Sequence, residues 1–325
     1  MRIAALAPDA RAALWIGATL VSLDAAPRLG LPAFPAGTIP RDLLGDDALA
    51  HSARRLHAAL LALDAERLRA LVSDGVAFDA ASTALLPPVR PRTIVCAGNN
   101  YRRHAAEMNT PLPSRPAGFL KAPSALNGPD APIVLPPAPT VASTIDYEGE
   151  VCVVIGRAAY RVAESEALAY VGGYTCANDV SARNDVRAMF DWLRDPGAIA
   201  LEAFANPQDV VLLGKQYPTF FPLGPCITTS DEIPDVAALH LTTRVDGEVR
   251  QSESASDLVF GVAQMVAYWS RYYALEPGDV ISTGSPSGVA LSFVPPRFLR
   301  AGSVVEVEIS GIGVLRNPVV ASPVR

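Results

Sequence analysis

The chain has 325 residues, of which 50% are apolar and 18% are charged, and its formal net charge is −6. This composition supplies a packed core and excludes general disorder. The acidic balance argues against a nucleic-acid partner, and the longest apolar runs fall short of the roughly 20 residues of a membrane helix. At roughly 150 residues per domain, the length predicts two domains or one large one.

The cysteines and the first residues predict a cytoplasmic protein. The four cysteines are widely spaced and form no Cys-x-x-Cys pair, which indicates reduced thiols. Asp9 and Arg11 interrupt the first apolar stretch, so we expect no signal peptide.

Residues 1–88 are predicted to form a small α/β domain. The expected elements are strands at Arg2–Ala7 and Ala12–Leu23 and helices within residues 41–73. The proline-rich segment Leu86–Pro91 then predicts a boundary, and residues 89–325 form the second domain.

The second domain has a mixed pattern that is rich in strands. We expect strands at Thr93–Ala97, Tyr147–Ile155, Tyr170–Ala177, Val280–Thr283 and Val304–Ile309, a hairpin over Arg244–Gln251, and helices at Glu164–Tyr170 and Ser256–Tyr273. Gly172 and Gly173 are expected to end the first of these helices.

Glu148 and Glu150 lie two residues apart in a predicted strand, so their side chains project from one face. Two carboxylates this close repel each other unless a cation or water lies between them. A hard divalent ion resolves the repulsion if the face is interior, and solvent does so if it is exposed. Glu306 and Glu308 repeat the spacing, and we expect that pair to be solvated.

Three further positions carry both a functional and an ordinary interpretation. Asp179 follows an uncharged strand and is either a ligand at a site mouth or an ordinary helix-cap or turn residue. His104 and Glu107 share a helix face, either as a general base with its orienting carboxylate or as a surface pair.

Only two of the 27 basic residues are lysines, Lys121 and Lys215. Both have apolar, glycine and proline neighbours, which favours a pocket over chance survival at the surface.

Taken in order, these segments resemble the fumarylacetoacetate hydrolase family over about residues 93–320. The motifs that carry the resemblance are Gly98–Tyr101 with His104 and Glu107, Phe119–Lys121, Tyr147–Glu150, Gly172–Tyr174, Asn178–Arg183, Gly214–Lys215 with Pro222–Pro225, Gly278–Gly284 and Pro286–Val289.

The resemblance implies an α+β, β-rich fold, in which a mixed β-sandwich roll follows the small α/β N-terminal domain, and it implies a homodimer. It also implies Mg²⁺, or else Mn²⁺ or Ca²⁺, held by Glu148, Glu150 and Asp179. The implied catalytic residues are His104, Glu107 and Lys215, and the implied substrate-binding residues are Lys121, Arg183, Tyr101 and Ser285. Ser285 stands where family members usually have threonine, which keeps the hydroxyl.

The function implied first is hydrolysis of a C–C bond in a 2,4-dioxo acid of the acylpyruvate or fumarylpyruvate type. A His–Glu pair would activate water, and the metal and a lysine would stabilise the leaving enolate. The same scaffold also carries 2-oxo acid decarboxylases, isomerases or tautomerases, and hydratases or dehydratases, and a non-catalytic small-molecule binder is a third class. The apolar segment 184–213 is expected either to shape the substrate pocket or to contact a second subunit.

Overall fold

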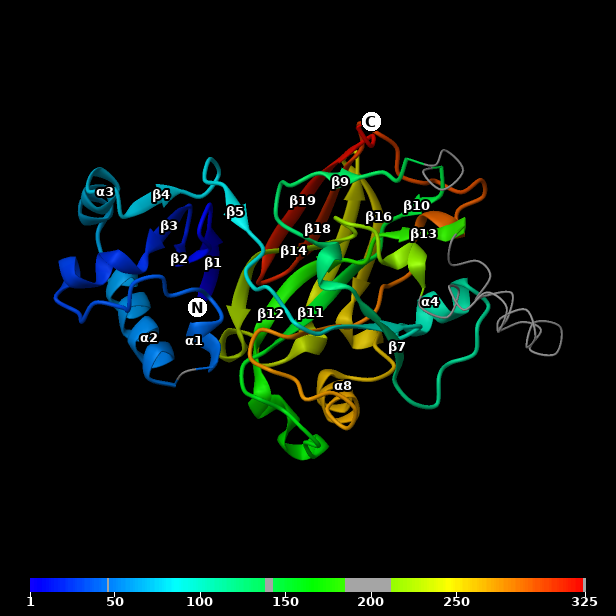
Figure 1. The fold of residues 1–325 in the computed structure, drawn as a ribbon, viewed down its shortest axis with the longest axis horizontal. Helices are drawn as coiled ribbons and strands as arrows, with labels where there is room; N and C mark the ends of the chain where they lie inside the picture. The colour runs from blue at the N-terminus through cyan, green and yellow to red at the C-terminus, as the bar shows by residue number, and fades with distance from the viewer. Residues whose placement is uncertain (46, 138–142, 185–211, 324–325) are drawn as a thin grey trace.

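The computed structural model describes residues 1–45, 47–137, 143–184 and 212–323, and most of the segment 184–213 therefore lies outside the described residues (Figure 1). The fold is mixed α+β and rich in strands, which confirms the predicted fold class. Among the described helices, none combines the length and the apolar character that crossing a bilayer requires.

The largest sheet runs through both predicted domains. Its main path is β4 (Ala77–Asp79), β3 (Thr19–Ser22), β2 (Arg11–Ile16), β1 (Arg2–Leu6), β14 (Phe221–Thr229), β12 (Val171–Asn178), β11 (Gly149–Ile155), β17 (Val280–Ser282), β6 (Ile94–Gly98) and β7 (Ala117–Lys121). β5 (Leu85–Leu86) pairs with β1, and β8 (Leu126–Asn127) pairs with β14. The antiparallel pairing of β1 with β14 joins the N-terminal strands to the rest of the sheet.

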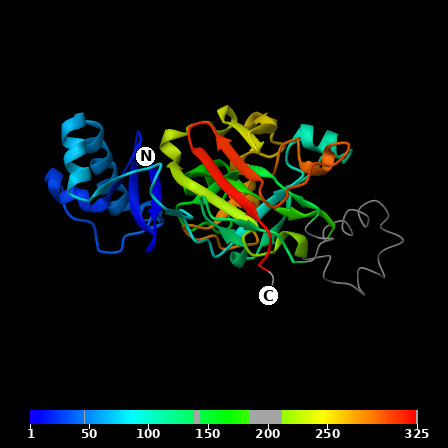
Figure 2. The same cartoon turned by 90° about the horizontal axis from the view of Figure 1, so that it is seen from above.

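A second sheet has five strands, and a small ribbon has two. The five are β16 (Glu248–Ser254), β15 (His240–Val245), β18 (Val304–Ile309), β19 (Gly313–Val320) and β9 (Ile133–Val134), and the two are β10 (Ile145–Asp146) and β13 (Ser181–Ala182). Within the described residues, the α-helices are α1 (Asp42–Gly45), α2 (Asp47–Leu61), α3 (Ala65–Ser73), α4 (Arg102–Glu107) and α8 (Val262–Trp269). In Figure 2 the blue N-terminal elements lie at one end, and the red β18–β19 hairpin crosses the face of the large sheet.

The two faces of β11 enter different cores. Val151 and Val153 pack into the core that the second sheet and α8 share with the large sheet, together with Val307 of β18. Cys152 and Val154 lie in a separate cluster on the opposite face. Strand alternation places Glu150 on this second face, so the predicted apolar continuation of the glutamate face is confirmed.

The N-terminal helices cover one side of β1–β3. Leu56 and Leu60 of α2 and Leu71 of α3 are buried in one cluster with Leu14 and Val21 of the strands. This cluster gives the first 77 residues an apolar core of their own.

One predicted strand was wrong. Ala12–Leu23 is not a single strand but the hairpin of β2 and β3, in which Ile16 pairs with Thr19. Gly17 adopts φ +57° at the turn, a backbone conformation that glycine reaches at little cost.

The helix predicted over Ser256–Tyr273 is shorter than expected, because α8 begins only at Val262. Gly261 is its N-cap residue, and the Gln264 side chain accepts the Gly261 N–H at 3.0 Å. Gly172 and Gly173 do not end a helix but lie inside β12. A Cβ atom on Gly172 would approach the Gly156 Cα to 2.9 Å, so glycine permits close backbone packing there.

Candidate metal centre

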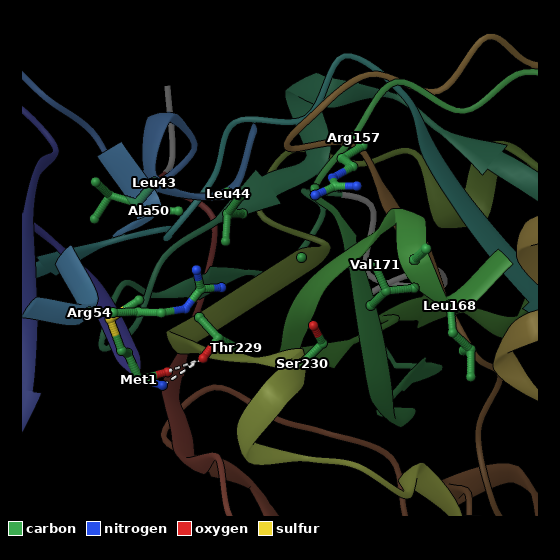
Figure 3. A pocket seen from close by; sticks show the side chains of 13 residues that line it. Met1, Leu43, Leu44, Ala50, Arg54, Arg157, Leu168, Val171, Thr229 and Ser230 are labelled. Carbon is green, nitrogen blue, oxygen red and sulfur yellow. Dashed lines mark hydrogen bonds between the residues drawn. The ribbon is translucent and has the colours of Figure 1, made fainter. Parts of the chain in front are cut away.

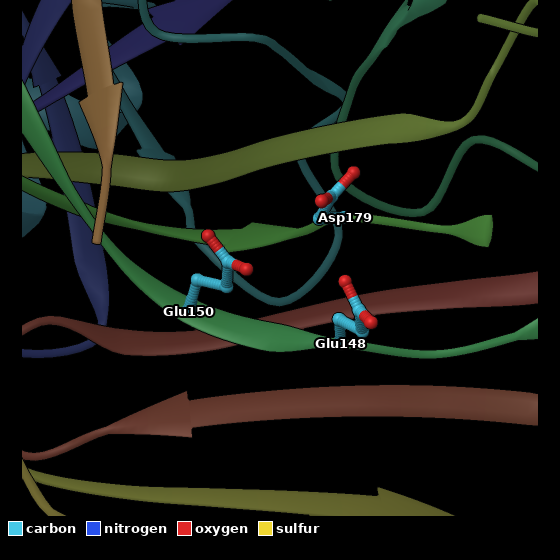
Figure 4. Close-up of side chains that lie close together, drawn as sticks. All are labelled: Glu148, Glu150 and Asp179. Carbon is cyan, nitrogen blue, oxygen red and sulfur yellow. The ribbon is translucent and has the colours of Figure 1, made fainter. Parts of the chain in front are cut away.

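Three buried carboxylates meet where β11 begins and β12 ends. Glu148, Glu150 and Asp179 are 6%, 1% and 1% exposed, and one ligand oxygen from each lies within 4.8 Å of the others. Figure 4 shows Glu148 and Glu150 on one strand, with Asp179 beside them at the end of its neighbour. Carboxylate oxygens are the ligands that hard divalent ions prefer, so this donor set fits Mg²⁺, Mn²⁺ or Ca²⁺. The three predicted ligands therefore form a divalent metal site.

Local backbone pairing sets this arrangement. Gly149 pairs with Asn178 across the two antiparallel strands, which places the residues that flank them side by side. The Asp179 N–H donates to the Glu148 carbonyl at 2.8 Å, and the Glu148 N–H donates to the Asn178 side-chain oxygen at 3.0 Å. The ligands are thus held by the strand ends rather than by a loose loop.

Both lysines of the chain contact carboxylates of this site. Lys215 Nζ lies 2.5 Å from a Glu148 oxygen and 2.7 Å from an Asp179 oxygen. Lys121 Nζ pairs with the other Asp179 oxygen and also donates to the Val180 carbonyl at 3.1 Å. Rings of Phe119 and Phe221 flank the ammonium groups.

Arg183 is bound within the protein. Its Nε donates to Asp146 at 2.7 Å, and a terminal nitrogen donates to Glu148 at 2.6 Å. Asp146 is fully buried and also accepts the N–H groups of Ala290 and Leu291, at 2.6 and 3.1 Å. The structure thus places Arg183 as a clamp on a metal ligand, and its predicted contact with substrate stays a prediction.

The buried charges around the site leave one excess negative charge among the described residues. The acids are Asp146, Glu148, Glu150 and Asp179, and the bases are Lys121, Arg183 and Lys215. A bound divalent ion reverses the sign to one excess positive charge. The site would then attract an anionic ligand.

The two glutamates differ sharply in their electrostatics. Burial alone would raise the pKa of Glu148, but Lys215 and Arg183 outweigh it and hold that pKa well below its ordinary range. Burial raises the pKa of Glu150 well above its usual value, and the charges of Asp179 and Glu148 raise it further. Among the described residues, Glu150 pairs with no cationic side chain.

Glu150 is instead held by neutral donors. The Ser282 hydroxyl donates to one of its oxygens, and the Gly284 N–H donates to the same oxygen at 3.1 Å. Because a carboxylate has about four lone-pair sites, this leaves acceptor capacity for a metal ion.

His104 and Glu107 lie together on α4, as the helical spacing predicted. His104 Nδ1 lies 3.1 Å from a Glu107 oxygen, and the two side chains are 13% and 22% exposed. Glu107 also accepts the Gly288 N–H at 2.9 Å, which docks α4 on the loop after β17. Burial acts to raise the pKa of Glu107, but hydrogen bonds from His104, Ser292 and Gly288 leave it lowered.

Two predicted substrate-binding hydroxyls are buried beside the site. Tyr101 is the N-cap residue of α4, and its side chain is buried. Ser285 is 6% exposed and accepts a hydrogen bond from Gln251 at 2.8 Å.

Sequence reasoning assigned no role to Asp146, Tyr147, Ser282 or Gln251. Tyr147 donates to the Gly288 carbonyl at 3.0 Å, so it supports the loop on which α4 docks. No local pattern marked Gln251, because its burial to 1% exposure is seen only in the structure.

A cavity of about 170 Å³ lies between the N-terminal helices and the large sheet (Figure 3). Its lining includes Arg54, Arg157 and Ser230 and contains no carboxylate or histidine. This cavity is therefore separate from the metal centre.

Three comparisons place the chain among known proteins. The family described as fumarylacetoacetate (FAA) hydrolase C-terminal matches residues 93–320. The chain is 39% identical over 238 residues to the mitochondrial oxaloacetate tautomerase FAHD2A of Bos taurus, which covers 73% of this chain and 69% of that protein.

Several solved structures match nearly the whole chain, including two enzymes. One is maleylpyruvate hydrolase from Sphingobium sp. SYK-6 in complex with manganese(II) and pyruvate, with a TM-score of 0.72, 27% identity and coverage of 99% and 100%. The other is 2-hydroxyhepta-2,4-diene-1,7-dioate isomerase from Mycobacterium marinum, with a TM-score of 0.66, 28% identity and full coverage of both chains.

Proposed function

The chain belongs to the fumarylacetoacetate hydrolase family, and from that premise we propose that it is a keto–enol tautomerase of a 2-oxo dicarboxylic acid such as oxaloacetate. It is a metal-dependent enzyme of that family. The observation that carries the proposal is the buried acidic triad, which lies beside the ammonium groups of Lys121 and Lys215. A paired His104 and Glu107 on α4 add a candidate general base. The similarity to oxaloacetate tautomerases supports the choice of reaction.

The proposed metal is Mg²⁺, held by Glu148, Glu150 and Asp179, where it would polarise the 2-oxo group as a Lewis acid. Lys215 remains an ammonium, because the charges of Asp179 and Glu148 outweigh burial and raise its pKa. It can therefore stabilise the negative charge that develops on an enolate oxygen. Lys121 and Ser285 are proposed to bind the substrate carboxylate.

His104 is the proposed general base. The lowered pKa of Glu107 keeps that carboxyl ionised, so it accepts the Nδ1–H of His104 and orients the ring. In the direction of enol formation, this tautomer leaves Nε2 to take a proton from C3 of the substrate while the C2 oxygen gains a proton from water. Ketonisation runs the same two proton transfers in reverse, so no bond between heavy atoms is broken.

Hydrolysis of a 2,4-dioxo acid is the second candidate. It is supported by the match of nearly the whole chain to maleylpyruvate hydrolase, including the N-terminal region. In this reaction His104 would take a proton from water, and the hydroxide would attack C4. The C3–C4 bond would then break, and the proton would return to C3 of the leaving enolate to give pyruvate and a carboxylic acid. Both candidate reactions, tautomerisation and hydrolysis, pass through the enol or enolate of a 2-oxo acid. They differ in whether water is added to the substrate.

One assay on metal-stripped protein separates the candidates. Enol absorbance and pyruvate release are followed together, with and without Mg²⁺, for oxaloacetate and for acetylpyruvate. Accelerated decay of enol oxaloacetate without pyruvate is the expected result. Pyruvate with carbon dioxide from oxaloacetate would instead indicate a decarboxylase, and pyruvate with acetate from acetylpyruvate would indicate the hydrolase.

Two histidine variants complete this test. His104→Asn should abolish the accelerated decay, whereas His51→Asn should leave it unchanged, because His51 lies exposed on α2. Full activity of His104→Asn would rule out the proposed base.

Further proposals concern organisation. We propose a division into two domains near residue 88, supported by the separate apolar core of the first 77 residues.

We also propose a homodimer in the cytoplasm, although the tautomerase relatives carry mitochondrial names. Light scattering on the purified protein tests the dimer.

A further inference from the structure

Gln251 connects the strand of the metal ligands to the turn that carries Ser285. It belongs to β16 of the second sheet and is 1% exposed. Its side-chain oxygen accepts the Gly149 N–H at 3.0 Å. Its side-chain nitrogen donates to Ser285 Oγ at 2.8 Å and to the Pro286 carbonyl at 2.9 Å.

The chemistry of the partners fixes the orientation of this amide. The Gly149 N–H can only donate, and the Pro286 carbonyl can only accept, so the Gln251 oxygen must face the first and the nitrogen the second. Ser285 Oγ therefore receives an N–H. Its own proton is left for another acceptor, and the Pro286 carbonyl at 3.4 Å is too distant for a strong bond.

Glycine at position 149 makes this contact possible. A Cβ atom there would lie 2.2 Å from Thr243 Oγ1 and 3.3 Å from the Gln251 oxygen. Residue 149 lies between Glu148 and Glu150. The Gln251 side chain therefore binds the backbone between two metal ligands. The position of Ser285 is thereby tied to the position of the metal site.

We propose that Gln251 is a positioning residue that makes Ser285 a hydrogen-bond donor to the carboxylate of a 2-oxo acid, an inference that rests on the proposed substrate class. A hydroxyl that accepts an N–H is polarised and donates more strongly. A donor aimed at an anionic oxygen forms the stronger, charge-assisted type of hydrogen bond. Gln251 acts through Ser285 and does not itself contact the substrate.

The test measures pyruvate binding to Mn²⁺-loaded protein, so it does not depend on turnover. Gln251→Met removes both hydrogen-bonding ends at similar length. Gln251→Glu keeps the acceptor for Gly149 but offers Ser285 an acceptor in place of a donor. Either variant should weaken pyruvate binding on the order of tenfold, the effect expected from losing one charge-assisted hydrogen bond.

A double variant identifies the route of the effect. Gln251→Met combined with Ser285→Ala should bind pyruvate no more weakly than Ser285→Ala alone, because both changes remove one interaction. The Mn²⁺ affinity of each variant should stay within about threefold of the parent. Gln264→Met, which removes an exposed amide from α8, is the matched control and should leave both affinities unchanged.

Three results would overturn the inference: unchanged pyruvate affinity in Gln251→Met and Gln251→Glu, additive losses in the double variant, or a fall in Mn²⁺ affinity that accounts for the loss. Failure of the proposed function looks different. In that case neither oxaloacetate nor acetylpyruvate is turned over, while pyruvate binding still depends on the coupled Gln251 and Ser285.

Discussion

Two strands of this protein carry glutamates at the same spacing, and their surroundings are opposite. Glu150 lies in β11 and Glu148 directly before it, and they are 1% and 6% exposed. The side chains of Glu306 and Glu308 on β18 are 31% and 45% exposed, and each lies near an arginine, Arg316 at 4.0 Å and Arg244 at 2.6 Å. The first pair belongs to a metal centre, and the second is the solvated strand face that the sequence predicted.

The two pairs differ because β11 is covered on both faces and β18 on only one. β11 lies inside the large sheet, between β12 and β17, and both of its faces enter buried clusters. β18 buries only the face that carries Val305, Val307 and Ile309. Spacing therefore determines that two glutamates share a face, and distant segments of the chain determine what that face becomes.

Exchanging one glutamate in each pair should give the largest contrast. Glu150→Gln removes a ligand charge, so Mn²⁺ affinity and turnover should each fall by more than about 100-fold. Glu306→Gln makes the same chemical change on the solvated face and should leave both unchanged. Metal titration and steady-state kinetics on the two variants measure the contrast, and equal losses in both would contradict it.

Removing the basic partner of a buried glutamate should lower the free energy of unfolding more than removing the partner of an exposed one. Lys215→Met leaves Glu148 and Asp179 without their shared ammonium, and breaking a buried pair costs about 3–5 kcal/mol. Arg244→Met breaks the exposed pair with Glu308, for which about 0–1 kcal/mol is expected. Urea unfolding of metal-free protein compares them, and a loss below 1 kcal/mol for Lys215→Met would show that solvent reaches the site.

The sequence predicted those features that depend on local pattern. The strand at Val304–Ile309 has the predicted bounds, since alternation of valine with glutamate needs no distant information. The three metal ligands were found through motifs in their order along the chain, and the two lysines were singled out by their scarcity and their neighbours. The hairpin at Gly17 was missed, because one turn glycine within an apolar run barely alters its periodicity.

The residues that sequence reasoning missed act across long separations. Gln251 contacts Gly149, 102 positions away, and Asp146 contacts Ala290, 144 positions away. Asp146 also accepts the N–H of its neighbour Tyr147 at 2.8 Å, but that local contact gives no sign of the distant ones. A single buried amide in a strand becomes meaningful only when the opposing backbone is known, so topology had to precede their roles. The division near residue 88 stays a prediction.

In the metal-free protein, neutralising the buried glutamate should raise the free energy of unfolding, and neutralising the exposed one should hardly change it. Glu150 is buried with no cationic partner among the described residues, so neutralising it with Glu150→Gln should raise stability by about 1–3 kcal/mol. Glu308→Gln should change stability by at most about 0.5 kcal/mol. Thermal unfolding in the presence of a chelator measures both. A destabilised Glu150→Gln would mean that its neutral donors already compensate the charge.

Glu107 lies between these extremes, because its side chain is 22% exposed and its pKa is lowered. A carboxyl whose pKa is lower in the folded state stabilises that state above its ordinary value of 4.5, and the contribution is lost as the pH falls through the lowered value. We therefore expect α4 to undock from Gly288 in acid below about pH 4.5.

Hydrogen exchange of peptides covering α4, measured between neutral pH and about pH 3.5 and corrected for intrinsic rates, tests this expectation. Protection of α4 should fall in acid, whereas protection of β18, with Glu306 and Glu308, should persist. Glu107→Gln keeps an oxygen for the Gly288 N–H but cannot titrate, so it should lose the pH dependence of α4 protection. Equal acid sensitivity in both strand and helix would indicate global unfolding and would remove Glu107 as the cause.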